Sequence, residues 1–113
     1  MQPDDEVYVG HMLDLVGKVV AKTERITREE FDRDENLRLA LAHLLQTIGE
    51  AARRVSRELQ AQHPEIPWAA IIGMRHKVVH DYMGIDEDVV WRTAREEVPR
   101  LGGLLQNLVV VDR

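Results

Sequence analysis

Apolar residues recur along the chain at the spacing of one face of an α-helix, in segments separated by capping and turn residues. The first segment predicts a helix from about residue 5 to about residue 24. Thr27 and Glu30 then have the spacing of a capping box, which starts a short helical turn that includes Phe31. The apolar positions of the first segment are Tyr8, Met12, Leu15, Val16 and Val19.

The most periodic segment follows Asp34, a second candidate helix cap. Its apolar residues keep helical spacing as far as Leu59, which predicts one helix of about seven turns that ends before His63 and Pro64. These apolar positions are Leu37, Leu41, Leu44, Leu45, Ile48, Ala52, Val55 and Leu59.

A turn with two prolines, residues 64–67, separates this helix from a third. Pro67 suits the first position of a helix. The third helix is expected to carry Trp68 and to stop near Met83 and Gly84, because Gly84 fits the left-handed residue that ends many helices.

Asp86 is a candidate cap for a fourth helix, and Pro99 is expected to divide that helix from a last apolar segment weakened by Gly102 and Gly103. No strand pattern is visible. The chain is therefore predicted to be a single all-α domain over residues 1–113, an up-and-down bundle of four to five helices.

The composition excludes several classes of protein. The 113 residues include no cysteine, which excludes disulfides, thiolate metal sites and a cysteine nucleophile. No stretch approaches the roughly 20 apolar residues of a membrane span. The acidic first residues do not look like a signal peptide, so we expect a cytoplasmic protein.

Charge is distributed unevenly along the chain. The net charge of -5 argues against broad, non-specific binding of nucleic acid, which depends on neutralising phosphates with Lys and Arg. Residues 53–82, however, hold five Lys and Arg against three Asp and Glu. This local excess of positive charge suggests an anion site.

The densest cluster of side chains able to do chemistry lies in the same window: Arg75, His76, Lys77, His80 and Tyr82. An arginine offers a permanent, forked set of donors that matches a phosphate. A histidine exchanges a proton near neutral pH. Together they suit metal-free cleavage of RNA, in which the histidine moves a proton, the arginine stabilises the phosphorane and the RNA 2′-hydroxyl is the nucleophile.

The spacing of these residues poses a problem if the helix is straight. At 100° per residue Arg75 and Tyr82 lie within about 20° of each other, whereas His80 lies about 140° from Arg75. Either the helix unwinds near His80, or a second copy of the chain completes the site across a two-fold axis. We favour a cleft between two copies.

Structural roles stay open for each residue. Arg75 would serve equally well in a surface ion pair. His80 is alternatively a histidine at the edge of the core, and Tyr82 is alternatively an aromatic residue at the boundary of the core. His76 and His80 have the i, i+4 spacing of two metal ligands, but no third ligand has a matching spacing, so we predict no metal site.

Three further residues are auxiliary candidates: His76, Lys77 and Glu50. Glu50 lies on the long predicted helix, where it is a candidate partner of Arg75 or Arg54. In that role it would hold the guanidinium toward a phosphate. The alternative is that Glu50 is an exposed helical glutamate with no role in the site.

The order of these residues resembles a known family. Arg75, four residues, His80, one residue and Tyr82 form the R-x4-H-x-Y motif of the HEPN superfamily. Their surroundings resemble the HepT-like toxin family over roughly residues 8–108. One departure is His76, where relatives commonly carry an asparagine. The matching segments in chain order are 48–52, 63–68, 73–75, 79–82, 84–86 and 90–91.

The resemblance implies an activity, partners and roles. HepT-like proteins are helical homodimers whose motifs face a shared cleft, and they act as metal-independent endoribonuclease toxins of toxin–antitoxin pairs. By resemblance Arg75 binds and stabilises the scissile phosphate of an RNA substrate, and His80 is the general acid or base. The implied antitoxin is an MntA-like minimal nucleotidyltransferase that transfers AMP from ATP to Tyr82. No cofactor is implied.

A second class of function fits the same residues. The chain would then be a non-catalytic HEPN binding module that forms a complex with the nucleotidyltransferase, or that binds a nucleotide through Arg75 and Lys77. The presence of all three motif residues favours the ribonuclease. Growth on induction without the partner distinguishes the two, because a binding module would leave growth unimpaired.

Overall fold

The computed structural model describes residues 1–80 and 84–112, with His80 described by its backbone. Its elements in chain order are α1 (Pro3–Thr23), α2 (Arg28–Arg33), α3 (Glu35–Arg54), α4 (Arg57–Gln62), α5 (Trp68–Ile72), α6 (Met74–Val78), β1 (Val79–His80), β2 (Gly84–Ile85), α7 (Glu87–Arg92), the π-helical turn η2 (Thr93–Glu97) and α8 (Val98–Val111). The predicted all-α class is confirmed, and the first helix has nearly the predicted bounds.

The predicted helix caps are confirmed. Thr27 and Glu30 form a full capping box: the Thr27 hydroxyl accepts the Glu30 N–H at 3.1 Å, and the Glu30 carboxylate accepts the Thr27 N–H at 3.0 Å. Asp34 and Asp86 each accept the backbone N–H three residues further on, at 3.0 Å and 3.2 Å. Each cap supplies an acceptor to an N–H group that the first turn of a helix leaves unpaired.

The prediction of one helix of about seven turns after Asp34 is wrong, because α3 ends at Arg54 and α4 begins at Arg57. Asp5 of α1 causes the break. Its carboxylate accepts the Ser56 N–H at 2.8 Å and the Ser56 hydroxyl at 2.7 Å. In a continuous helix that N–H would bond the carbonyl four residues earlier. Ser56 caps α4 instead.

The predicted third helix is interrupted and ends early. Gly73 separates α5 from α6, and α6 ends at Val78 rather than near Gly84. The carbonyl of Val78 accepts the backbone N–H of Asp86 at 2.8 Å. A donor from the start of α7 therefore replaces the next turn of the helix.

Beyond α6 the chain forms an antiparallel pair of two-residue strands, which the sequence did not predict. Val79 lies opposite Ile85, and His80 lies opposite Gly84. Gly84 has a φ of 76°, so its predicted left-handed conformation is confirmed. It serves the hairpin, however, and not the end of a helix.

Pro99 does not divide the C-terminal segment as predicted. The elements α7, η2 and α8 follow one another without a break. The N–H of Val98 bonds the carbonyl of Thr93, five residues earlier, and this widened turn accommodates a proline in the first turn of α8.

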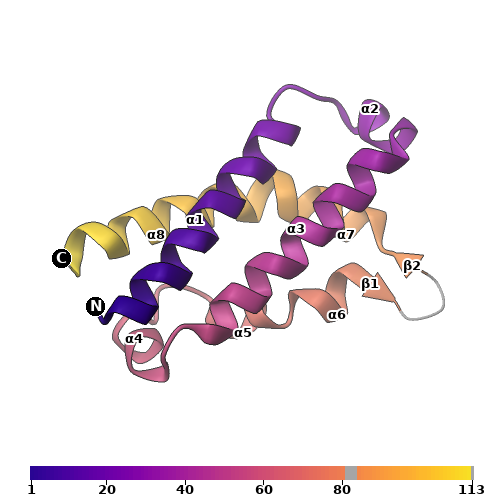
Figure 1. Cartoon of the computed structure of the whole chain (residues 1–113). Helices are drawn as coiled ribbons and strands as arrows, with labels where there is room; N and C mark the ends of the chain where they lie inside the picture. The colour runs from indigo at the N-terminus through magenta and orange to yellow at the C-terminus, as the bar shows by residue number, and fades with distance from the viewer. Residues whose placement is uncertain (81–83, 113) are drawn as a thin grey trace.

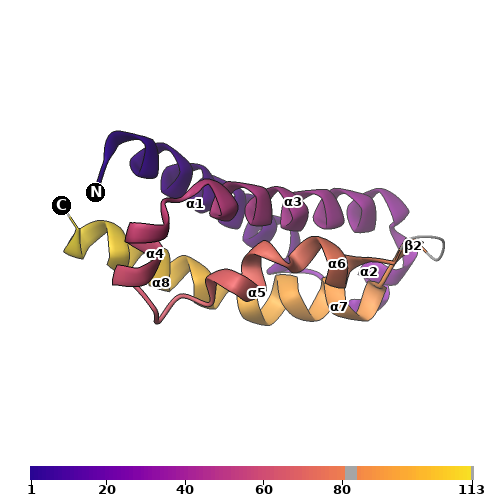
Figure 2. The same ribbon diagram turned by 90° about the horizontal axis from the view of Figure 1, so that it is seen from below.

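The helices form two layers. The helices α1 and α3 lie side by side in one layer, while α5, α6 and the run from α7 to α8 lie in the other (Figures 1 and 2). The two ends of the chain meet, and the amino group of Met1 lies 3.5 Å from the carbonyl oxygen of Asp112. Among the described residues, no helix is long and apolar enough to cross a membrane.

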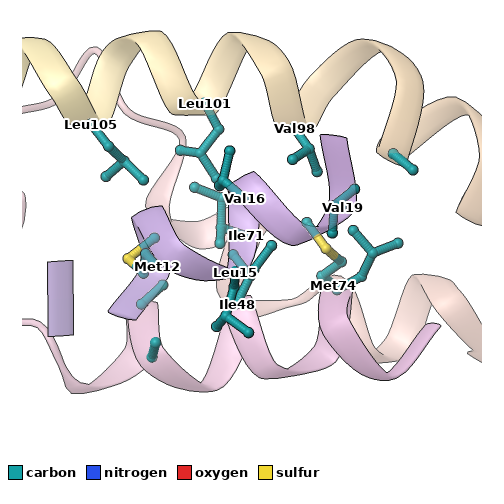
Figure 3. Close-up of a cluster of buried hydrophobic side chains, with 14 of the residues drawn as sticks. Met12, Leu15, Val16, Val19, Ile48, Ile71, Met74, Val98, Leu101 and Leu105 are labelled. Carbon is teal, nitrogen blue, oxygen red and sulfur yellow. The ribbon is translucent and has the colours of Figure 1, made fainter. Parts of the chain in front are cut away.

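The core fills the space between the layers (Figure 3). Met74 and Val78 are buried in it and anchor α6, so the residues between them lie on the surface. Gly49 lets α3 approach α5 closely, because a Cβ atom at this position would lie only 2.8 Å from the carbonyl oxygen of Ile71.

Candidate functional site

The short helix α6 presents three consecutive exposed side chains, those of Arg75, His76 and Lys77. Arg75 forms no hydrogen bond or ion pair with any residue that the structure describes. Arginines elsewhere in the fold, such as Arg28 and Arg38, have acidic partners. The Arg75 guanidinium is therefore exposed, with its donors unpaired within the described residues.

His80 follows on extended backbone. Because α6 ends at Val78, the angle of about 140° expected for a straight helix between Arg75 and His80 does not arise. Of the two alternatives, unwinding of the helix before His80 is confirmed. The geometric reason for a second copy of the chain is thereby removed. Tyr82 lies outside the described residues.

The hairpin is fixed at its base by the N-terminus of α7. Asp86 donates its N–H to Val78 and caps α7 with its side chain. The two residues that follow make ion pairs with α3 and α2, Glu87 with Arg38 at 3.4 Å and Asp88 with Arg28 at 2.6 Å. The sequence marks Asp86 as a cap, but it carries no signal for the pairs to α2 and α3.

Glu50 does not pair with Arg75 or Arg54. Its carboxylate accepts a hydrogen bond from Arg53 at 3.0 Å, because residues three apart on one helix face each other. The guanidinium of Arg54 lies 5.9 Å from the centre of the Tyr8 ring. The prediction that Glu50 contacts Arg75 and orients it is therefore wrong.

The i, i+4 pair of histidines loses its common helical face, because α6 ends between His76 and His80. Within residues 1–80 and 84–112, no group of three His, Asp or Glu side chains is arranged to hold a metal ion.

A cavity of about 320 Å³ lies between the α5–α6 segment and the η2–α8 segment. Lys77 is at its edge, whereas Arg75 does not line it. Lys77 and Arg75 are two residues apart on α6, so they point in different directions. The cavity is lined by Glu65, Pro67, Ala70, Ile71, Met74, Lys77, Thr93, Glu97, Val98, Arg100, Leu101 and Leu104.

His63 has a structural environment away from α6. Its ring nitrogens lie 3.1 Å from Glu65 and 2.9 Å from Asp112, and the indole N–H of Trp68 donates to its carbonyl at 3.0 Å. Burial lowers the pKa of His63, but the hydrogen bonds to Asp112 and Glu65 outweigh burial and raise it. The pKa of Glu65 is lowered by a backbone hydrogen bond and by His63.

The described elements place the protein in the all-α class. Arg75 lies on the short helix α6, and His80 lies on the strand that follows.

Comparison with known proteins identifies the family within that class. A family model described as Ribonuclease HepT-like matches residues 12–108. The chain therefore belongs to the HepT-like ribonuclease family.

Two relatives share most of their length with this chain. A "Probable ribonuclease HepT" from Thermococcus cleftensis is 32% identical over 108 residues, which cover 96% of this chain and 98% of the relative. A protein named "Putative RNase" from Caldanaerobacter subterraneus is 33% identical over 94 residues, which cover 83% of this chain and 84% of the relative. No solved structure matches the chain significantly.

Proposed function

We propose that this member of the ribonuclease family is a metal-independent endoribonuclease and the toxin of a toxin–antitoxin pair. Arg75 binds the scissile phosphate, and His80 is the general acid or base. The observation that carries the proposal is the exposed Arg75 guanidinium, which has no partner among the described residues and lies five residues before His80, across the end of α6. Family membership supports RNA as the substrate.

The chemistry needs few groups from the protein. The 2′-oxygen of the RNA forms a bond to phosphorus while the bond from phosphorus to the 5′-oxygen breaks. His80 takes the proton of the 2′-hydroxyl or returns one to the leaving 5′-oxygen. Arg75 donates to the phosphoryl oxygens as negative charge builds up on the phosphorane.

His76 and Lys77 are proposed as auxiliary residues. Both are exposed on α6 beside Arg75, where a cation or a polar donor can contact a neighbouring phosphate of the same RNA strand. His76 offers a donor at the position where the resemblance leads us to expect an asparagine.

The proposed regulation follows from the resemblance. An MntA-like minimal nucleotidyltransferase transfers AMP from ATP to the hydroxyl of Tyr82, and pyrophosphate leaves. The product carries a bulky anion two residues from His80. Such an anion competes with RNA for Arg75 by charge and by size. The active form is proposed to be a homodimer, as the resemblance implies.

The test is cleavage of total cellular RNA by the purified chain in the presence of a chelator. Intact mass first establishes that the protein is unmodified, and His80→Ala serves as the control. We expect the parent to cleave and the variant to be inactive with unchanged helicity. Cleavage by both proteins would overturn the role of His80. Cleavage by neither would favour a non-catalytic binding module that acts through the nucleotidyltransferase.

A further inference from the structure

We infer that Arg38 is a positioning residue for RNA cleavage: it holds the first turn of α7, and through it the hairpin that carries His80, against α2 and α3. The inference rests on the proposed role of His80. It concerns a residue that lies outside the R-x4-H-x-Y motif and on a different helix.

Arg38 connects three helical elements. Its Nη1 donates to the carbonyl of Phe31 at 3.0 Å and to the carbonyl of Asp32, and its Nε lies 3.4 Å from Oε1 of Glu87. Its side chain is only 16% exposed. Because the guanidinium is planar and its donors have fixed directions, these acceptors are held in one mutual arrangement.

The connection continues from Glu87 to the hairpin through the backbone. The preceding residue, Asp86, donates its N–H to the carbonyl of Val78 at 2.8 Å, and β1 begins at the next residue, Val79. β2 ends at Ile85, directly before Asp86, and Ile85 is the register partner of Val79. A shift of the first turn of α7 is therefore passed to both strands and to the end of α6.

Arg28 provides the matched comparison. It also reaches α7, through Asp88 at 2.6 Å, but its side chain is 39% exposed and that of Asp88 is 80% exposed. An exposed ion pair contributes little to position or stability because water and salt screen it. Arg38 differs from Arg28 because its side chain is only 16% exposed and donates to two backbone carbonyls.

The experiment compares Arg38→Met with Arg28→Met. Initial rates of cleavage of total cellular RNA are measured against RNA concentration, and circular dichroism and thermal unfolding monitor the fold. We expect Arg38→Met to lower kcat by about 10- to 100-fold with little change in KM, because small misplacements of catalytic groups have effects of this size. Arg28→Met is expected to stay within about twofold of the parent, because both of its ion pairs, with Asp32 and Asp88, are exposed.

Glu87→Gln extends the test if Arg38→Met folds poorly. Glu87 is half-exposed, so its replacement leaves the core intact. It should also lower kcat. In the double variant the two effects should not add, because both substitutions break the same connection. A folded Arg38→Met or Glu87→Gln protein with the parent kcat would overturn the inference.

Hydrogen exchange separates this inference from the proposed function. If the parent does not cleave RNA, the proposed function fails, but the exchange rate of the Asp86 amide still reports on the hairpin anchor. Faster exchange at Asp86 in Arg38→Met than in Arg28→Met would support positioning by Arg38. Equal rates in the two variants would overturn it.

Discussion

At the scale of single residues, the arginines of the fold differ in their partners. Arg28, Arg38 and Arg53 each have acidic partners, and Arg95 donates to the carbonyl of Thr23 at 2.9 Å. Arg75 is exposed and has no such contact within the described chain. Its replacement therefore removes no hydrogen bond or ion pair within the described residues.

Arg75→Lys keeps the charge but loses the forked donors. We expect cleavage of total cellular RNA to fall by about 100-fold, the loss typical of removing one donor to a developing oxyanion. The melting temperature should stay close to that of the parent, because surface substitutions of this kind change stability by about 0.5 kcal/mol or less. Arg25→Lys, at an exposed arginine in the loop between α1 and α2, is the matched control. Parent-like cleavage by Arg75→Lys would show that a point charge suffices.

His63 holds the two ends of the second half of the chain together. Only the protonated ring can donate from both nitrogens, to Glu65 in its own turn and to Asp112 at the end of α8. The two carboxylates are the charged partners of its ring, and the amino group of Met1 lies 3.5 Å from the carbonyl oxygen of Asp112. The charged form of His63 is thus the stabilising one.

The sign of the pH dependence follows from the two shifted groups. The pKa of His63 is raised above 6.5. Its contribution to the stability of the fold is therefore complete below pH 6.5, and it is lost as the pH rises through the pKa of His63 in the folded protein. The pKa of Glu65 is lowered below 4.5. Its contribution to the stability of the fold is therefore present above pH 4.5, and it is lost as the pH falls through the pKa of Glu65 in the folded protein. The contact is strongest between these values.

His63→Gln should therefore lower the melting temperature most near pH 5.5, by a few degrees, and least near pH 9. Thermal unfolding followed by circular dichroism across this range measures the difference from the parent. His43→Gln, at an exposed histidine of α3, should show no such trend. A deficit of equal size at pH 5.5 and pH 9 would mean that packing, not the charged ring, stabilises this turn.

At the scale of elements, local signals predicted where helices begin better than where they end. The caps at Thr27, Asp34 and Asp86 depend on atoms within three residues of each other, so the sequence displays them. The end of α3 depends on Asp5, which lies 51 residues from Ser56 in the chain. The end of α6 depends on the N–H of Asp86. Partners that lie so far away in the chain do not change the spacing of apolar residues, so the sequence pattern does not reveal them.

For the candidate site too, the sequence predicted the local features, and the structure was needed for those that depend on distant residues. The residue types and spacing of Arg75, His80 and Tyr82 were visible in the sequence, as was the need for the helix to unwind or for a second copy to contribute. The choice between these required the structure. Arg38 could not have been found, because nothing near it in the sequence relates it to Glu87, which is 49 residues further on.

The contact of α3 with α5 leads to a prediction at this scale. Gly49→Ala would place a Cβ atom 2.8 Å from the carbonyl oxygen of Ile71, so the helices must move apart. We expect a loss of about 1–3 kcal/mol in the free energy of unfolding, as for other overpacked contacts. Because α5 leads into α6, cleavage of RNA should fall as well.

Gly17→Ala is the control for Gly49→Ala. Gly17 lies within α1, and a Cβ atom there would meet nothing within 4 Å. Alanine should raise the free energy of unfolding by about 0.5–1 kcal/mol, because it favours the helix. Urea denaturation measures both variants. Equal stabilisation at the two glycines would contradict the close contact of α3 with α5.

At the scale of the whole molecule, the charges limit how RNA can bind. The net charge is -5, and several of the cations are paired with acids on the surface of the fold. Among the described exposed cations, Arg75 and Lys77 of α6 are the nearest to the hairpin along the chain. If RNA binds at α6 as proposed, it would meet a small basic site on an acidic molecule rather than an extended basic surface. Recognition by shape or by an exposed single strand would then be favoured.

This charge distribution predicts a weak dependence of RNA binding on salt. With about two or three phosphates neutralised, the slope of log affinity against log salt concentration should be about −1.4 to −2.1 for single-stranded RNA.

His80→Ala allows the binding of labelled total RNA to be followed by fluorescence anisotropy without cleavage. Lys77→Met should make the slope shallower by about 0.7, because one phosphate contact is lost. Lys18→Met, at an exposed lysine of α1, should leave it unchanged. A slope steeper than about −5 would require more cations than α6 supplies, and would show that RNA contacts a much larger part of the surface.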